Sequence, residues 1–321
     1  MTSWIGDPEL IASAERALGA GHPVAAIALV TPHGGAEALR GAAPENDFEI
    51  GSISKTITGM LYRASIEHGR VEPTTTLGEL LPLADHGAVE TITLESLATH
   101  HSGLPRLAPG MQPWRRTWRL WTRGENPYGE TLAQLLEQTR GITLGPPRAR
   151  YSNLGFQLLG HAVAAAESMS YRDLLTATFG PGFATPHHAD ELRPTSLLGA
   201  TRRRRPRAAW VGEAIAPTGG IRATIGTMRE LLHRILDGTA PGLSALDAHT
   251  PYSPGVRIGA GWITLGRPGR EVTWHNGGTG GFRSFIGVDR TAGVGVVVLS
   301  ARDRSVDRAG FALLREHAPE R

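Results

Sequence analysis

Segments typical of β-strands stand at both ends of this 321-residue chain, and their placement limits the fold more than any other feature. Residues 24–30 form an apolar run that is followed by a Pro-His-Gly-Gly turn and by residues 36–40, which predicts a hairpin. Strand composition returns near the C-terminus in four segments separated by Gly-rich or Asp-containing turns: residues 257–265, 271–275, 282–288 and 293–300. We therefore expect one antiparallel sheet made from both ends of the chain.

The segments between these strands carry helical periodicity. A first helix is predicted with Asp7 as its N-cap and Pro8 at its first position. Further helices are expected over residues 52–68, 94–99, 131–139, 154–166, 171–179 and 307–317. These patterns predict an α/β fold, in which an antiparallel sheet formed by both termini is flanked by helices and carries an inserted all-helical subdomain. Residues 1–70 and 205–321 would form the sheet subdomain, and residues 71–204 the mainly helical insert.

The composition excludes several classes of function. Without cysteine, the chain has no thiol nucleophile, disulfide, cysteine zinc site or iron–sulfur cluster. The adjacent histidines at 100–101 and 187–188 lack metal-ligand spacing, so no metal site is expected. A formal charge of +3 gives no reason to expect a nucleic-acid partner, and the arginine run 202–205 has no interleaved aromatic residues and is interpreted as a solvated connector. No apolar window predicts a membrane span and residues 1–21 do not resemble a secretory signal, so we expect a cytoplasmic protein without a membrane partner.

One residue stands out among the basic side chains. Of the 33 basic residues, 32 are arginines and Lys55 is the only lysine. Lys55 follows Ser52 by three positions at the start of an expected helix, so the two side chains lie on one face. A buried lysine can lose its proton, and a serine hydroxyl needs such a base to become a nucleophile. A capping serine beside a solvated lysine is the alternative, but a merely solvated position in this chain would be expected to hold arginine.

Two loop segments carry further polar groups. Tyr151-Ser152-Asn153 follows a Gly- and Pro-containing loop and precedes an expected helix. Tyr151 could relay protons and Asn153 could hold a carbonyl group, although a packed tyrosine beside a capping asparagine is an equally good interpretation. The segment 275–282, His-Asn-Gly-Gly-Thr-Gly-Gly-Phe, ends one expected strand and begins another. Its glycines would let a substrate approach the backbone, where a free N–H can serve an oxyanion hole.

These motifs, taken in order, carry a family resemblance. Ser52-x-x-Lys55, Tyr151-x-Asn153 and His275-x-Gly277 resemble the three motifs of the penicillin-recognising serine hydrolases. The likeness is greatest to the class C β-lactamase-like group of esterases, D-aminopeptidases, DD-peptidases and transacylases. Three further segments are similar to that group: Thr99-His100-His101-Ser102-Gly103-Leu104-Pro105, Gly219-Gly220-Ile221 and Gly259-Ala260-Gly261-Trp262. The fold that this resemblance implies, an α/β domain from both termini with a helical insert, agrees with the expectation from the strand pattern.

The resemblance implies a role for each motif position. Ser52 would accept the acyl group, Lys55 would activate it, and Tyr151 would assist proton transfer to the leaving group and to the deacylating water or acceptor. Asn153 would contact the acyl side of the substrate, and the backbone N–H groups of Ser52 and Gly278 would form the oxyanion hole. No metal or organic cofactor is implied.

The third motif departs from the family pattern and affects the expected substrate. β-Lactamases and DD-peptidases usually carry lysine where this chain has His275, which is mostly neutral at pH 7 and weakens recognition of β-lactams and D-Ala-D-Ala termini. Arg283 is then the candidate partner for a substrate carboxylate. Trp118 is a further candidate for substrate binding, since Trp114, Trp118 and Trp121 recur at helical spacing. That stripe would either cover the site or pack on the core.

We therefore expect a cytoplasmic serine acyl-enzyme hydrolase or acyltransferase that acts on an ester or amide of a small molecule or peptide. In an acyltransferase, an amine would take the place of water in the second step. DD-peptidase or β-lactamase activity is one alternative. A non-catalytic ligand-binding module on the same scaffold is another, although such a module has no reason to keep its only lysine beside Ser52.

Overall fold

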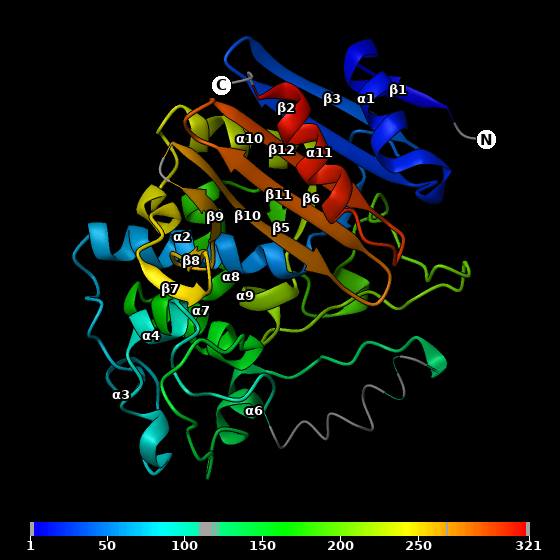
Figure 1. Ribbon diagram of the computed structural model, residues 1–321. Coiled ribbons are helices and arrows are strands. Elements are labelled where there is room, and N and C mark those ends of the chain that lie inside the picture. The colour runs from blue at the N-terminus through cyan, green and yellow to red at the C-terminus, as the bar shows by residue number, and fades with distance from the viewer. Residues whose placement is uncertain (1–2, 109–117, 119, 121, 268, 319–321) are drawn as a thin grey trace.

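The largest element of the structure is a nine-stranded antiparallel sheet in the order β1-β3-β2-β12-β11-β10-β9-β8-β7 (Figure 1). The structure is a computed structural model, and it describes residues 3–108, 118, 120, 122–267 and 269–318. The sheet contains these strands: β1 (Trp4–Gly6), β2 (Ala25–Thr31), β3 (Gly34–Arg40), β7 (Thr250–Ser253), β8 (Val256–Ile258), β9 (Ile263–Arg267), β10 (Arg270–Gly278), β11 (Arg283–Asp289) and β12 (Val294–Ser300). β2 pairs with β12 from Ala25↔Ser300 to Val30↔Gly295, so the predicted joining of the two chain ends in one antiparallel sheet is confirmed.

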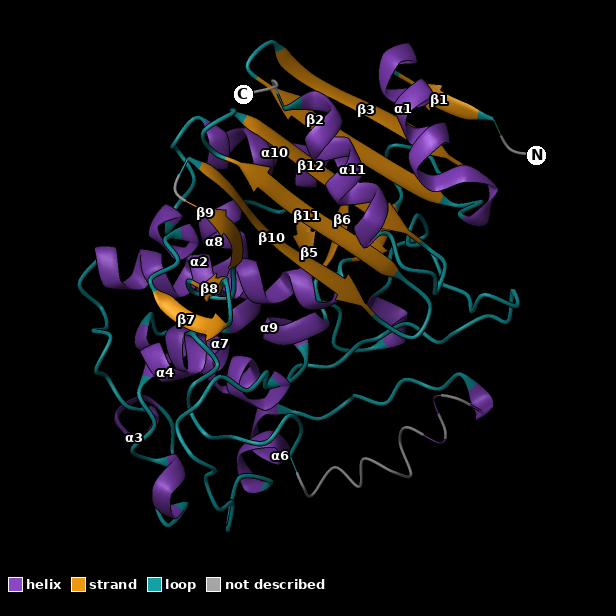
Figure 2. Ribbon diagram, in the orientation of Figure 1, coloured by secondary structure: helices purple, strands orange, loops and turns teal. Residues whose placement is uncertain are grey.

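Helices cover both faces of the sheet (Figure 2). The first cluster of buried side chains joins Ile27 and Leu29 of β2 to α1 (Pro8–Leu18) and α11 (Asp307–His317). The alternate β2 residues, Ala26 and Ala28, belong to the other cluster, together with side chains of α10 (Ile225–Leu236). Because both faces are buried, β2 and β12 read as continuous apolar runs without polar alternation. The predicted N-cap is also confirmed, since Asp7 Oδ1 accepts a hydrogen bond from Leu10 N at 2.9 Å.

The remaining helices gather on the side of the molecule opposite α1 (Figure 1). Among the helices whose bounds the structure describes, they include α2 (Ser54–Glu67), α3 (Leu77–Leu80), α4 (Leu94–Ala98), α6 (Leu132–Glu137), α7 (Asn153–Ala166), α8 (Tyr171–Phe179) and α9 (Ala216–Gly219). None of the helices in the described ranges is long and apolar enough to cross a membrane. The inserted subdomain was expected to be all-helical, with residues 71–204 mainly helical; the described part of this segment also contains a strand, β5 (Phe183–Ala184). β5 belongs to a three-stranded sheet with β4 (Asp47–Glu49) and β6 (Arg222–Thr224).

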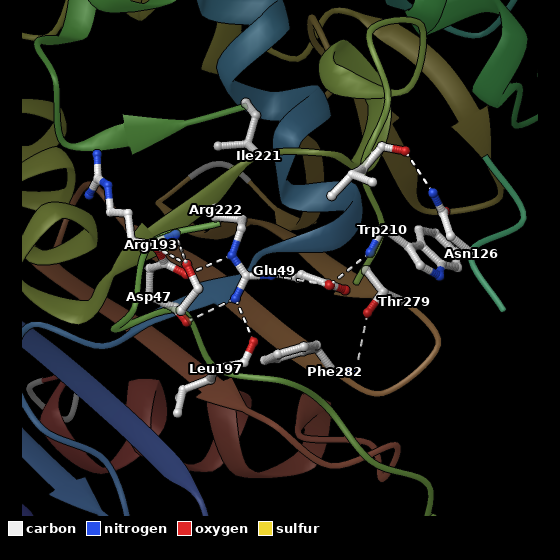
Figure 3. Close-up of polar contacts among 12 residues, drawn as sticks. Asp47, Glu49, Asn126, Arg193, Leu197, Trp210, Ile221, Arg222, Thr279 and Phe282 are labelled. Atoms are coloured by element: carbon white, nitrogen blue, oxygen red, sulfur yellow. Dashed lines mark hydrogen bonds and ion pairs between the residues drawn. The ribbon is translucent and has the colours of Figure 1, made fainter. Parts of the chain in front are cut away.

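The small sheet holds a buried ionic cluster (Figure 3). Arg222, which is 1% exposed, pairs with Asp47 at 2.6 Å and with Glu49 at 3.2 Å. Burial raises the pKa of Glu49, whereas the Arg222 charge opposes that shift. Glu49 also accepts the Trp210 backbone N–H at 2.9 Å and a hydrogen bond from the Thr279 side chain. The cluster therefore connects β4 and β6 to the turn that follows β10.

The prediction of one strand over residues 257–265 is wrong, because this segment forms β8 and β9 with a tight turn between them. Gly261 in the turn has a φ of +75°, which favours glycine. The turn also packs closely on α2, since a Cβ added to Gly59 would lie 1.9 Å from the Ala260 carbonyl oxygen. The helix expected over residues 52–68 divides as well, into a 3₁₀ turn (Gly51–Ile53) and α2.

Candidate active site

Ser52 lies in the 3₁₀ turn that precedes α2, and its hydroxyl contacts both of the other candidate catalytic side chains. Lys55 Nζ lies 3.2 Å from Ser52 Oγ and donates a second hydrogen bond to the Thr218 carbonyl oxygen at 2.8 Å. Tyr151 Oη donates to Ser52 Oγ at 2.7 Å. The structure thus brings Tyr151 to Ser52 and Lys55, although Ser52 and Tyr151 are 99 positions apart in the sequence.

Burial sets the protonation states of these groups. Desolvation, helped by the charge of Arg106, holds the pKa of Lys55 well below its ordinary value. Desolvation raises the pKa of Tyr151 and keeps its hydroxyl protonated. The lowered pKa makes the neutral form of Lys55 easier to reach, and a neutral amine has a lone pair for the Ser52 proton, while the protonated Tyr151 donates to the same oxygen. The arrangement is therefore suited to moving a proton from Ser52 to Lys55.

His275 lies on β10 beside this group. Its Nδ1 is 2.6 Å from the Asn276 carbonyl oxygen, and its ring centroid is 6.4 Å from that of Tyr151. Burial, with a smaller contribution from the charge of Lys55, lowers the pKa of His275 to about 4. The imidazole is thus neutral at pH 7, and it supplies no permanent positive charge to the site.

The backbone of the glycine-rich segment passes close to the nucleophile turn. A Cβ added to Gly51, whose φ is +54°, would lie 2.6 Å from Gly278 N. Ser284 Oγ donates to the Ile50 carbonyl oxygen at 2.7 Å and fixes β11 against the same turn. Gly278 N therefore lies close to Gly51, the residue before Ser52. The predicted oxyanion hole needs the N–H groups of Ser52 and Gly278 near each other, and this packing is consistent with that requirement.

A cavity of about 480 Å³, here called the catalytic cavity, contains this site. Its lining includes Ser52, Tyr151, His275 and Gly278, as well as three arginines: Arg106, Arg202 and Arg283. Arg106 was not predicted, although it directly follows the Gly103-Leu104-Pro105 segment, and its guanidinium lies 5.5 Å from the Tyr151 ring centroid. Arg283, the candidate carboxylate partner, is paired with Asp303 at 2.5 Å.

Two candidate substrate-binding residues are not among the residues that line the catalytic cavity in the described parts of the chain. Asn153 begins α7 and donates its backbone N–H to the Arg106 carbonyl oxygen at 2.9 Å. Trp118 is 59% exposed, and its ring centroid lies 5.9 Å from the guanidinium carbon of Arg123. The other members of the predicted tryptophan stripe, Trp114 and Trp121, lie outside the described residues.

His100 is a further residue of the site, and it forms hydrogen bonds with both sequence neighbours of Tyr151. The His100 carbonyl oxygen accepts the Arg150 N–H at 2.9 Å, and His100 Nδ1 accepts the Ser152 N–H at 3.2 Å. The imidazole also lies against the phenol ring, with a centroid distance of 4.7 Å. Burial, followed by the charge of Lys55, keeps the pKa of His100 well below its usual value, so Nδ1 stays an acceptor. We infer that His100 positions Tyr151 for its contact with Ser52.

His100→Ala is expected to lower kcat by about 100-fold, because the removal of both ring contacts lets the Tyr151 hydroxyl move by about 1 Å. His100→Asn is expected to keep most of the activity, since its side-chain carbonyl can replace Nδ1 and asparagine tolerates the φ of +61° at this position. Steady-state kinetics of the two variants test this role. His101→Asn, at a neighbour whose ring bonds to the Thr99 carbonyl and not to the Tyr151 segment in the described chain, is the control. Equal kcat values for His100→Ala and His100→Asn would contradict the inference that His100 positions Tyr151.

The family model described as beta-lactamase matches residues 11–318. This chain belongs to the beta-lactamase family. Its members are serine hydrolases, so the predicted resemblance and the prediction of an enzyme are both confirmed.

Relatives within the beta-lactamase family include peptidases and beta-lactamases. The D-alanyl-D-alanine-carboxypeptidase/endopeptidase AmpH of Escherichia coli K12 is 25% identical over 283 residues, which cover 79% of this chain and 70% of AmpH. A beta-lactamase of Providencia stuartii is 26% identical over 158 residues, which cover 48% of this chain and 38% of that enzyme.

Solved structures of the beta-lactamase family share the fold. The class C beta-lactamase from Rhodobacter sphaeroides has a TM-score of 0.77 at 20% identity, with 95% of this chain and 98% of that chain covered. The D-alanine carboxypeptidase AmpC from Burkholderia cenocepacia has a TM-score of 0.79 at 18% identity, with 96% and 99% covered. The α/β architecture predicted from the strand pattern is the architecture of these proteins.

Proposed function

We propose that this beta-lactamase-family enzyme is a serine acyl-enzyme hydrolase or acyltransferase that cleaves an ester or amide of a small molecule or peptide. The observation that carries the proposal is the position of Ser52 Oγ, 2.7 Å from Tyr151 Oη and 3.2 Å from the buried Lys55 Nζ. A serine hydroxyl shared between a neutral amine and a protonated phenol has both a base and a proton donor within reach.

In the first half of the proposed reaction, Ser52 Oγ gives its proton to Lys55 Nζ as it bonds to the acyl carbon. The carbonyl electron pair moves onto the oxygen, which accepts hydrogen bonds from the N–H groups of Ser52 and Gly278. When the carbonyl re-forms, the bond to the leaving group breaks. The leaving group takes a proton from Tyr151, which regains one from Lys55, and the acyl group stays on Ser52.

In the second half, water or an amine attacks the acyl-enzyme. Its proton passes through Tyr151 and Lys55 to Ser52 Oγ, which leaves as the free hydroxyl. Hydrolysis and acyl transfer differ only in the molecule that attacks. An amine bound in a site poor in water would direct the enzyme to transfer.

The neutral His275 favours esters and simple amides over β-lactams in this proposal, because the third motif supplies no cation for a substrate carboxylate. D-Ala-D-Ala carboxypeptidase activity is the second candidate. Two observations favour it: AmpH is similar to 79% of the chain, and Arg106 and Arg202 bring positive charge to the catalytic cavity from other elements.

Intact-protein mass spectrometry after brief mixing with an activated short-chain ester tests the proposal. We expect a mass increase of one acyl group, which is absent in Ser52→Ala because the nucleophile is missing. A chromogenic cephalosporin and a D-Ala-D-Ala peptide are tested in parallel, and turnover of either one instead of the ester would favour the second candidate or β-lactamase activity. Ligand binding without any Ser52-dependent adduct or turnover would contradict the proposal and support the binding-module alternative.

A further inference from the structure

A second cavity adjoins the catalytic cavity. It has a volume of about 500 Å³ and is lined by Gly21, Arg202, Arg302, Arg304 and Ser305; we call it the outer cavity. Arg202 and Ser305 also line the catalytic cavity, so the two volumes share a wall formed by these residues. Each cavity is within the size range of small-molecule sites, and together they suit an elongated substrate.

Main-chain carbonyl groups, which carry no formal charge, hold two of the arginines in the outer cavity. Arg302 Nη1 donates to the Thr201 carbonyl oxygen at 2.9 Å, and Arg202 Nε donates to the Asp303 carbonyl oxygen at 3.1 Å. These bonds orient the guanidinium groups without neutralising them. Among the residues of the described chain that line the outer cavity there is no carboxylate, and the neighbouring Asp303 carboxylate is paired with Arg283 at 2.5 Å.

The uncompensated charge acts on a neighbouring group. Burial is the main cause that lowers the pKa of His22 to about 4, and the charges of Arg304, Arg40 and Arg302 add to it. Arg304 lies directly across Gly21, where an added Cβ would be 2.4 Å from its Nη1. The outer cavity therefore has a positive potential that extends into the protein beside it.

We propose that the outer cavity binds an anionic group, a carboxylate or a phosphate, on the end of the substrate remote from the scissile bond. The inference rests on the proposed function, since it assumes that the reacting carbonyl lies at Ser52. Guanidinium groups match the paired oxygens of both anions, and their hydrogen bonds to a charged group are among the strongest in proteins. The arginine run 202–205, interpreted from the sequence as a connector, thus contributes Arg202 to both cavities.

Two series of esters test the proposal with matched chemical reactivity. The first series consists of phenyl acetates with a para ethylene spacer that ends in a carboxamide, a carboxylate or a phosphonate. The second consists of 4-nitrophenyl esters of hexanoic acid, pimelamic acid and pimelic acid, which place the charge on the acyl part. The methylene groups insulate the scissile bond from the charge, and five of them keep the carboxylate from closing a small ring onto its own ester carbonyl. We expect kcat/KM for the anionic member of at least one series to exceed that of its neutral partner by tenfold or more.

Arg304→Gln is expected to abolish this anion preference and to leave kcat/KM for the neutral esters unchanged, because Arg304 lines the outer cavity and is not among the described residues that line the catalytic cavity. Arg203→Gln is the matched control. It also removes one positive charge, this time from the arginine run 202–205, but Arg203 is not among the described residues that line either cavity. The carboxylate and phosphonate arms distinguish the two anions. Equal kcat/KM values for neutral and anionic esters in both series, or an equal loss of preference in Arg203→Gln, would overturn the proposal.

Calorimetry with the Ser52→Ala variant separates a failure of this proposal from a failure of the proposed function. The probes are 2-phenylethylphosphonate, 3-phenylpropanoate and the neutral 3-phenylpropanamide. Tighter binding of an anion than of the amide, lost when Arg304→Gln is added, supports the outer site even if no ester is cleaved. Equal binding of all three probes overturns it, whatever the esterase result.

Discussion

Lys55→Met is expected to slow acylation of Ser52 by about 10²- to 10⁴-fold, the usual contribution of a general base. In the proposed mechanism the amine accepts the Ser52 proton because burial lowers its pKa, and methionine fills the same space without a lone pair of this basicity. Lys55→Arg is not expected to restore the rate, since a guanidinium stays protonated. The rate at which the acyl adduct appears by mass spectrometry measures the effect.

The pH dependence of acylation gives an independent check on the same residue. In the wild-type protein the rate should rise with pH through the lowered pKa of Lys55, as the amine becomes neutral, and then stay level. No decrease is expected at weakly alkaline pH, because the pKa of Tyr151 is raised and its hydroxyl stays protonated.

Arg63→Met is the control for Lys55→Met, because it removes a cation from the same helix, α2, at a residue outside the lining of the catalytic cavity in the described chain. An unchanged rate in Lys55→Met would assign the base to another group.

Arg222→Met is expected to lower the free energy of unfolding by about 3–5 kcal/mol, the typical cost of removing one partner from a buried ion pair. Asp47 and Glu49, only 2% and 3% exposed, would be left without their counterion. Urea denaturation followed by circular dichroism measures the loss. A decrease in activity is expected as well, because Glu49 holds the Thr279 side chain directly after Gly278.

Two further variants separate this effect from general damage to the fold. Combining Arg222→Met with Asp47→Asn and Glu49→Gln should recover much of the lost stability, since no uncompensated charge remains. Arg229→Met breaks the pair with Glu37, in which the arginine side chain is 40% exposed, and should cost no more than about 1 kcal/mol. Equal losses for Arg222→Met and Arg229→Met would show that burial of the cluster has no energetic consequence.

The sequence was sufficient to predict the elements with strong local signals. The helix expected over residues 307–317 has the bounds of α11, and the cap at Asp7 is present. Lys55 and Tyr151 both lie at hydrogen-bond distance from Ser52, while the roles that the family resemblance implies for the three residues stay predictions. The bounds of α11 and the cap at Asp7 could be predicted because helical periodicity and capping depend on neighbouring residues.

Other features depend on contacts that a local pattern does not contain. Strands β4, β5 and β6 have two or three residues each, too few for alternation to be recognised. Arg222 and Asp47 are 175 positions apart, so nothing near either residue indicates that both are buried. The role of His100 follows from its positive φ and its two bonds to the flanks of Tyr151, which appear only in three dimensions.

The pairing of β2 with β12 has a consequence for the synthesis of the protein. The β2–β3 hairpin leaves the ribosome early, but one edge of β2 finds its partner only when Val294–Ser300 has been made. At roughly 5–20 residues per second, that apolar edge waits on the order of 10–50 s. An unpaired apolar edge strand is a template for aggregation. Binding of a chaperone to the nascent hairpin is therefore expected to determine the yield of folded protein, because the central sheet cannot close before β12 has left the ribosome.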